Sequence, residues 1–490
     1  MMLYTISHPG TRAIRVRVNS SQFQLNYLFG RSCSIIRTLS TTQTHDTTTN
    51  NVKVTPLKQW KVPMIESHGD YRAEAFLEGY IGGPLYEHQS TLPRLPVPSI
   101  EDTLKRFLPT ALPLAKNDQE RAALIQATKD FPEQAHKLQK RLLDRKEEME
   151  DSSWLQLWWN TLGYLQVRDP VVVNVSYFFG FIDDPTIDST YSAPNIQRGA
   201  ALLYAAAEFR KMVVTGQLPY ERVGKKKTPM CSTAYKYQFH ATRIPHRGQD
   251  TYRIYDPSKY THCIVARKGQ FFSMELVDRE SADPLSVVVL EEQLEQILKE
   301  ADSIVSGSPS LGILTSQDRD SWADARDSLI RLGGSEMEEA LTKLESGALL
   351  LNLDDEAPIS RQECGEVFLT GGLNSGSNRW FDKSIQLMVQ NNGKAGGIFE
   401  HSMMDGAPSI VFANYITGVT YRDAKRRSLG KSPMSGNVEN IFHSAIMKVN
   451  RSKLSALESK GKQERCMAIR LLFSDGIVSI SHHSLPRIKR

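Results

Sequence analysis

The sequence is poor in cysteine, and it has neither a long apolar run nor a serine-nucleophile motif. Its 490 residues contain five cysteines, an odd number, and none belongs to a CxxC pair. A disulfide framework or a zinc site is therefore not expected, and a reducing interior is favoured. No apolar run reaches the ~18 residues that a membrane-spanning helix needs. The sequence also has no GxSxG motif, which argues against a serine hydrolase.

Acidic residues are missing from the first 45 residues, which contain five arginines and many Ser and Thr. This composition predicts a mitochondrial transit peptide at residues 1–45, with a disordered N-terminal tail as the alternative. Residues 418–490 are also basic, with 15 Lys and Arg against 5 Asp and Glu, whereas the body between the two ends has 40 basic and 50 acidic residues. Because the excess positive charge belongs to the ends, no nucleic-acid-binding surface is expected.

Helical and strand patterns alternate along the body, which predicts an α/β protein. Residues 46–145 contain a linker and then a long Glu/Lys-rich helix, for which Asp118 offers an N-cap. Residues 146–417 form the main α/β domain. Within it, β-rich runs on both sides of Arg267-Lys268-Gly269 predict a hairpin. Gly333-Gly334 ends one helix before the next begins.

A histidine at the end of a predicted strand is the best candidate for chemistry. Residues 384–389 and 395–400 are strand-like and are joined by the tight turn Asn392-Gly393. His401 follows the second strand, where a rigidly held imidazole can face a cleft and act as a general base. Asp405, four residues later, is a candidate for orienting it. From these residues alone a structural histidine is favoured, and a metal site is weak because only two ligands are close in sequence.

The surrounding sequence adds a family resemblance. Residues 396–406, GGIFEHSMMDG, resemble the active-site signature of the carnitine/choline acyltransferases. Further blocks resemble the same family and occur in family order. These blocks are LPRLPVP at 92–98 with Thr103-Leu104, WWNTLGYL at 158–165, RIP at 243–245 with QDT at 249–251, GILTS at 312–316 with Trp322, and NRWFDK at 378–383.

The resemblance implies a chloramphenicol-acetyltransferase-like two-domain α/β architecture and a reversible acyl transfer between coenzyme A and an alcohol. His401 would deprotonate the carnitine hydroxyl in one direction and the coenzyme A thiol in the other, with Asp405 beside it and no acyl-enzyme. Trp159 and Tyr164 match positions of the carnitine pocket, where aromatic side chains suit a quaternary ammonium. Four more family positions are expected to support the active site structurally: Asn378, Arg379, Trp380 and Asp382.

Residues 402–406, SMMDG, are most similar to acetyl-specific family members, especially fungal ones. The resemblance therefore implies carnitine and acetyl-CoA as substrates, with coenzyme A as co-substrate and no cofactor or metal. It also implies a mitochondrial location, in the matrix or at the inner-membrane face with peripheral association, and a monomer. A peroxisomal pool is the expectation for a longer form. Another acyl chain, or choline as acceptor, is the alternative within the family.

The resemblance fades after Tyr415-Ile416, whereas family members continue for about two hundred residues, a length typical of another domain. Residues 418–490 are therefore expected to be a basic tail unrelated to the family. Most of the second domain would then be missing, and the helical segment in 46–145 would lack the domain on which it normally packs. Losing one oxyanion donor typically costs about 10²–10³ in rate. Little or no transferase activity is expected, with a non-catalytic binding protein as the alternative.

Overall fold

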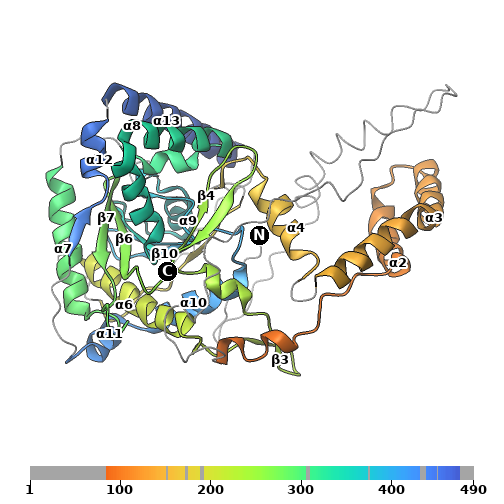
Figure 1. The fold of residues 1–490 in the computed structure, drawn as a ribbon, viewed down its shortest axis with the longest axis horizontal. Helices are drawn as coiled ribbons and strands as arrows, with labels where there is room; N and C mark the ends of the chain where they lie inside the picture. Colours follow the sequence, from red (N-terminus) through yellow and green to blue (C-terminus); the bar gives the residue numbers. More distant parts are fainter. Residues whose placement is uncertain are drawn as a thin grey trace, which may run out of the picture. The chain divides into compact units, whose positions relative to one another are not determined.

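A seven-stranded mixed sheet organises the fold in the computed structural model (Figure 1). The structure describes residues 84–149, 153–171, 175–187, 193–304, 310–372, 376–430, 437–449 and 451–474. The predicted transit peptide at 1–45 lies outside these residues. Among the described helices, none combines the length and the apolar character needed to cross a bilayer.

The strand order of the sheet is β1-β10-β9-β8-β6-β7-β11. Strand β8 is parallel to its neighbours β6 and β9, and the other pairs are antiparallel. Parallel neighbours need long crossover connections, and here a helix precedes β8 and another follows it. The strands are β1 Tyr177–Gly180, β6 His262–Arg267, β7 Gln270–Glu275, β8 Leu350–Leu353, β9 Ile385–Val389, β10 Ala395–Phe399 and β11 Val438–Asn440. Two small sheets pair β2 Arg222–Val223 with β3 Thr228–Pro229, and β4 Ala241–Ile244 with β5 Thr251–Ile254.

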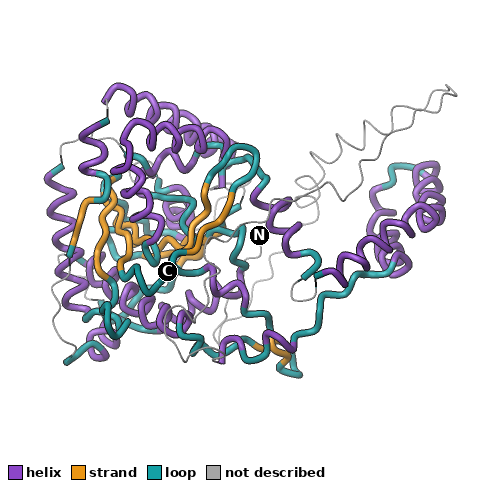
Figure 2. Tube along the Cα trace, viewed as in Figure 1, coloured by secondary structure: helices purple, strands orange, loops and turns teal. Residues whose placement is uncertain are grey.

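Helices cover both faces of the sheet (Figure 2). On β6, Cys263 and Val265 belong to one apolar cluster, whereas Ile264 and Ala266 belong to another. Successive side chains of a strand point to opposite faces, so this continuous apolar run requires cover on each side. The first cluster includes residues of α6 Pro194–Val214, α7 Val287–Ser303, α10 Gly406–Gly418 and α11 Tyr421–Arg427. The second includes residues of α8 Arg319–Ser346, α12 His443–Lys448 and α13 Arg451–Ser474, and a third, smaller cluster includes Phe368 of α9 Arg361–Thr370.

Several local predictions are confirmed, and one is wrong. Strands β6 and β7 pair around a turn in which Lys268 and Gly269 have φ of 50° and 75°, the positive values that a two-residue hairpin turn requires. Gly334, with φ of 58°, separates two helical segments of α8. Helix α3 Asp118–Glu148, which follows α2 Ile100–Ala111, is capped by Asn117 and not by Asp118. The Asn117 side chain accepts a hydrogen bond from the backbone N–H of Glu120 at 2.8 Å, and Asp118 is already the first helical residue.

The basic segment after residue 417 continues the α/β fold, whereas the sequence analysis expected a tail separate from it. Helix α11 packs on α6 and α7, β11 pairs with β7, and α12 packs on α8. Ala424, Phe442 and Leu454 are buried among exposed lysines and arginines, so the charge of the segment concealed its apolar pattern. The described residues of this segment extend the sheet and cover one of its faces.

Candidate active site

His401 lies where β10 leaves the sheet and the chain turns into α10, at the end of the strand as predicted. Strand β10 is paired on both sides, with β1 and with β9, so the backbone before His401 is held rigidly. The imidazole side chain is 27% exposed. Within the described part of the chain its ring nitrogens make no hydrogen bond, and its polar contact is with Asp405. A partly exposed imidazole with an available nitrogen can accept a proton from a bound substrate.

Two tyrosine rings pack edge-on against this imidazole. The ring centroid of Tyr164 lies 5.1 Å from that of His401, and the centroid of Tyr177 lies 4.9 Å from it. The interplanar angles are 73° and 86°, the edge-to-face geometry that aromatic pairs favour. The two tyrosines come from separate segments and together restrict the orientation of the imidazole.

Tyr164 belongs to the π-helical turn η6 Thr161–Leu165, which continues α4 Gln156–Asn160. Its ring lies between those of His401 and Trp159, and the centroid of Trp159 is 6.3 Å from that of Tyr164. Trp159 is 58% exposed, whereas partial burial raises the pKa of the Tyr164 hydroxyl. The structure therefore places both predicted carnitine-binding side chains in one row of rings that ends at His401.

Tyr177 is a neighbour of His401 that the sequence analysis missed. It is the first residue of β1 and pairs in register with Phe399 of β10. Its hydroxyl donates to the carbonyl oxygen of Asp405 at 3.1 Å and lies 2.6 Å from Ser409 Oγ, and burial raises its pKa. Tyr177 thereby ties β1 to the start of α10. The local sequence signal is only the aromatic run Tyr177-Phe178-Phe179.

Asp405 caps α10 and also approaches the imidazole. Its Oδ1 accepts a hydrogen bond from the backbone N–H of Gly406 at 2.6 Å and lies 3.4 Å from His401 Nε2. The Asp405 side chain is 86% exposed, and solvent weakens the interaction of such a charge with its neighbours. Among the described residues, no cluster of three His, Cys, Asp or Glu side chains is arranged to hold a metal ion.

Four buried side chains hold the chain just before β9: Asn378, Arg379, Trp380 and Asp382. Arg379 forms a bidentate ion pair with Asp354, in which Nη1–Oδ1 is 3.0 Å and Nη2–Oδ2 is 2.7 Å. Asp382 accepts a hydrogen bond from Trp322 Nε1 at 2.6 Å. Because these side chains are turned into the protein, their contacts position β9 rather than face a substrate.

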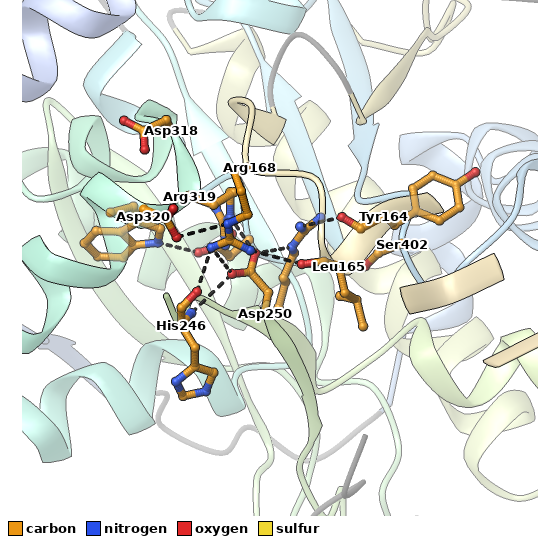
Figure 3. A network of polar contacts seen from close by, with 12 residues as sticks. Tyr164, Leu165, Arg168, His246, Asp250, Asp318, Arg319, Asp320 and Ser402 are labelled. Atoms are coloured by element: carbon orange, nitrogen blue, oxygen red, sulfur yellow. Dashed lines mark hydrogen bonds and ion pairs between the residues drawn. The ribbon is translucent and has the colours of Figure 1, made fainter. Parts of the chain in front are cut away.

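A chain of buried ion pairs runs through the site (Figure 3). Arg243 of β4 pairs with Asp250 (Nε–Oδ2, 2.7 Å) and with Glu400 (Nη1–Oε1, 3.3 Å). The same Asp250 carboxylate pairs with Arg319 Nε at 2.6 Å and with Arg168 Nη2 at 3.0 Å. Burial acts to raise the pKa of Asp250, but the three guanidinium groups outweigh it and hold the pKa below its usual value. The sequence analysis quoted the RIP and QDT blocks but assigned Arg243 and Asp250 no role.

A family comparison agrees with this site. The sequence matches the family model "Choline/Carnitine o-acyltransferase" over residues 95–464. The chain therefore belongs to the choline/carnitine O-acyltransferase family. The match includes the basic segment up to residue 464, which the fold also incorporates.

Relatives in this family include enzymes named for different acyl groups. The chain is 31% identical to carnitine O-acetyltransferase of Rattus norvegicus over 367 residues, 72% of this chain and 56% of that protein. It is 30% identical to the mitochondrial carnitine O-acetyltransferase of Saccharomyces cerevisiae over 342 residues, 68% and 49% of the two chains. It is 31% identical to the mitochondrial carnitine O-palmitoyltransferase 2 of Mus musculus over 406 residues, 77% and 58%. The chain thus spans about half the length of the relatives it matches.

Among solved structures, a chloramphenicol acetyltransferase matches 56% of this chain and 94% of its own, at 12% identity and a TM-score of 0.23. This score is too low to establish a shared fold. The α/β class itself follows from the mixed sheet and its helical layers.

Proposed function

We propose that this protein is a carnitine O-acetyltransferase that moves an acetyl group reversibly between acetyl-CoA and carnitine, with His401 as general base. Membership of the family supports acyl transfer. The observation that carries the proposal is the His401 imidazole, which is partly exposed, packed between two tyrosine rings and without a hydrogen bond at its ring nitrogens within the described residues.

In the proposed forward step, a neutral His401 takes the proton of the carnitine hydroxyl. The oxygen attacks the thioester carbonyl carbon, the C–S bond breaks, and the coenzyme A thiolate receives the proton back from the imidazolium. The reverse reaction uses the same proton in the opposite order. No covalent intermediate on the protein is required, because each substrate supplies the group that the other accepts.

The row of rings beside His401 supports carnitine as the acceptor. A quaternary ammonium interacts favourably with the face of an aromatic ring, and tryptophan is the best partner. Trp159 leaves more than half of its surface open to a ligand, and Tyr164 lies between it and the base. An acceptor held over these rings would carry its hydroxyl to the imidazole.

Acetyl specificity and a mitochondrial location are the finer parts of the proposal. The first rests on the similarity of residues 402–406 to acetyl-specific members, since the relatives include both acetyl- and palmitoyltransferases. The second rests on the arginine-rich composition of residues 1–45 and on relatives that are mitochondrial by name.

The decisive experiment measures coenzyme A release from acetyl-CoA, with and without carnitine, using this chain and its His401→Ala variant. General acid–base catalysis is worth about 10²–10⁴ in rate, so the variant should lose that factor. His136→Ala, on the exposed surface of α3, is the matched control and should keep the activity of the unmodified chain. Carnitine-independent release, or equal rates for the His401→Ala variant and the unmodified chain, would contradict the proposal.

A second assay separates the acyl chain and the acceptor. Acetyl-, octanoyl- and palmitoyl-CoA are compared with carnitine, and acetyl-CoA is compared with carnitine and choline. We expect the highest kcat/KM for acetyl-CoA with carnitine. A preference for palmitoyl-CoA or for choline would retain acyl transfer and reject the proposed specificity.

A further inference from the structure

Arg243 occupies a place where a charged side chain is costly. It lies on β4, a strand whose four residues are all buried, and its side chain is fully shielded from solvent. Its backbone N–H donates to the carbonyl oxygen of Asp382 at 2.9 Å. A buried guanidinium is tolerated only where its charge is paired and its N–H groups are bonded. The positions of its partners therefore show what the residue holds together.

Each nitrogen of this guanidinium is directed to a different segment of the chain (Figure 3). Nε pairs with Asp250 Oδ2 at 2.7 Å, Nη1 pairs with Glu400 Oε1 at 3.3 Å, and Nη2 donates to the carbonyl oxygen of Tyr164 at 2.9 Å. Asp250 is the anchored end, because Arg319 and two further donors, the Arg168 guanidinium and the His246 backbone N–H, also bond to its carboxylate. The other two partners belong to the segments that meet at the candidate active site.

Glu400 transmits this contact to the turn that carries His401. Its Oε2 accepts hydrogen bonds from the backbone N–H of Ser402 at 3.1 Å and from the Ser402 hydroxyl at 2.5 Å. Its own backbone N–H donates to the carbonyl oxygen of Ser384 at 3.1 Å. The carboxylate thus links the residue before His401 to the residue after it. With Arg243 on Oε1, both oxygens of Glu400 are fixed and the turn has little freedom.

The contact with Tyr164 fixes the opposite side. In η6 the backbone N–H of Gln166 bonds to the carbonyl oxygen of Thr161 at 2.8 Å, the i→i+5 pattern of a π-helix. Such turns occur frequently at functional sites. The carbonyl of Tyr164 accepts from Arg243 as well as from the backbone N–H of Val167 at 3.1 Å. Arg243 therefore holds the main chain beneath the Tyr164 ring.

We propose that Arg243 is a positioning residue that sets the separation between the His401 imidazole and the Tyr164 ring. One rigid planar group bonds both segments and refers them to the anchored Asp250. Planarity and three separate bonding directions are properties of arginine that lysine lacks. This inference rests on the proposed function, in which His401 is the base and Tyr164 lines the acceptor pocket.

The test compares Arg243→Lys with Arg247→Lys in the full chain. Lysine keeps the positive charge, but it offers a single nitrogen in place of the three that Arg243 uses. A misplacement of about 1 Å at a reacting group can cost ~10² in rate, so Arg243→Lys should lower kcat by that factor. Arg247, in the same β4–β5 loop, is exposed and pairs with Asp324 outside the site, so its variant should keep wild-type kinetics.

Crystal structures of both variants give a readout that does not depend on activity. The Tyr164–His401 centroid separation, 5.1 Å in the unmodified chain, should change in Arg243→Lys and stay unchanged in Arg247→Lys. If the unmodified chain transfers no acetyl group, the proposed function fails while this distance still decides the positioning role. An unchanged separation in Arg243→Lys, or an unchanged kcat in an active enzyme, overturns the inference.

Glu400→Gln provides a second variant in case Arg243→Lys does not fold. It keeps the size of the side chain and leaves the bonds from Arg243 to Asp250 and Tyr164 in place. It removes the charge that holds Arg243 Nη1 and the Ser402 N–H together. The same loss of kcat, with a shifted His401 ring and cooperative thermal unfolding, is expected. A Glu400→Gln variant with wild-type ring positions overturns the inference as well.

Discussion

His240 and His401 both lie beside strands, yet the regions around them impose opposite states on the imidazole. His240 is buried, and both of its ring nitrogens are occupied. Nε2 accepts from Arg210 Nε at 2.7 Å, so Nδ1 carries the proton and donates to the carbonyl oxygen of Ser346 at 2.8 Å. Burial, together with the charge of Arg210, lowers the pKa of His240 well below its usual value. His240 is thus fixed as a neutral structural residue.

His401 has the reverse arrangement. Its side chain is partly exposed, and rings rather than hydrogen-bonding groups surround it. An imidazole that must accept and return a proton needs a nitrogen that substrate can reach. The comparison shows that residue type and strand-end position do not distinguish a base from a structural histidine. The occupancy of the ring nitrogens does.

The largest expected effect separates the two histidines by stability. His240→Ala removes the acceptor for Arg210 Nε inside the protein, and a buried charged donor without its acceptor costs about 3 kcal/mol. His401→Ala loses two edge-on ring contacts at a partly exposed site, about 1 kcal/mol. Urea denaturation of both variants measures the difference, with the exposed His443→Ala as control. Equal losses for His240→Ala and His401→Ala would contradict the structural assignment of His240.

Lowering the pH should destabilise the protein through its buried histidines. Burial lowers the pKa of His262 to about 4, whereas an unfolded histidine has a pKa near ~6.5. Below ~6.5 the unfolded state therefore binds the proton first, so stability is present at neutral pH and is lost as the pH falls. Between pH 7 and 5, His262 alone should account for about 2 kcal/mol, at ~1.4 kcal/mol per pKa unit. His240 acts in the same direction.

Urea denaturation at several pH values checks this dependence. His262→Gln should flatten the fall in unfolding free energy between pH 7 and 5, because the group that titrates has been removed. His401→Ala, which removes a histidine that has no buried hydrogen bonds, serves as the comparison variant. The linkage is contradicted if His262→Gln and the unmodified chain lose stability in parallel over this range.

Local patterns predicted those parts of the fold that depend on neighbours in sequence. The turn at Lys268-Gly269, the break at Gly334 and the strand end before His401 each follow from a few adjacent residues. The cap of α3 was placed one residue too late, since Asn117 and Asp118 are both good capping residues and only the bond to Glu120 distinguishes them. The basic segment after residue 417 was misjudged because its buried residues are sparse among exposed charges.

The network around Arg243 shows what local reasoning does not reach. Arg243 and Glu400 are 157 residues apart, and Tyr177 and the Asp405 carbonyl are 228 apart. A charged residue inside the apolar strand β4 is the one local sign that a buried partner exists. It does not indicate which acid provides that partner. The family resemblance located His401, Tyr164 and Trp159, whereas their mutual distances depend on the sheet.

The Tyr177 hydroxyl offers a smaller test of the His401 side. Tyr177→Phe keeps the ring against the imidazole but removes the bonds to the Asp405 carbonyl and to Ser409 Oγ. One lost hydrogen bond of this kind costs about 1 kcal/mol. Thermal or urea unfolding measures the loss, with Tyr220→Phe, whose partner Arg222 is exposed, as the control. If the two variants lose equal stability, Tyr177 does not tie β1 to α10.

The smallest expected effect concerns Asp405, whose carboxylate both caps α10 and approaches His401. Asparagine caps a helix about as well as aspartate, so Asp405→Asn should change the free energy of unfolding by less than ~0.5 kcal/mol, whereas Asp405→Ala should lose about 1 kcal/mol. Because Asp405→Asn keeps the cap and removes only the charge, its kcat isolates the charge effect on His401. The side chain is largely exposed, so the loss in kcat should be smaller than that of His401→Ala. A loss as large as that of His401→Ala would show that the 3.4 Å contact tightens when substrates bind.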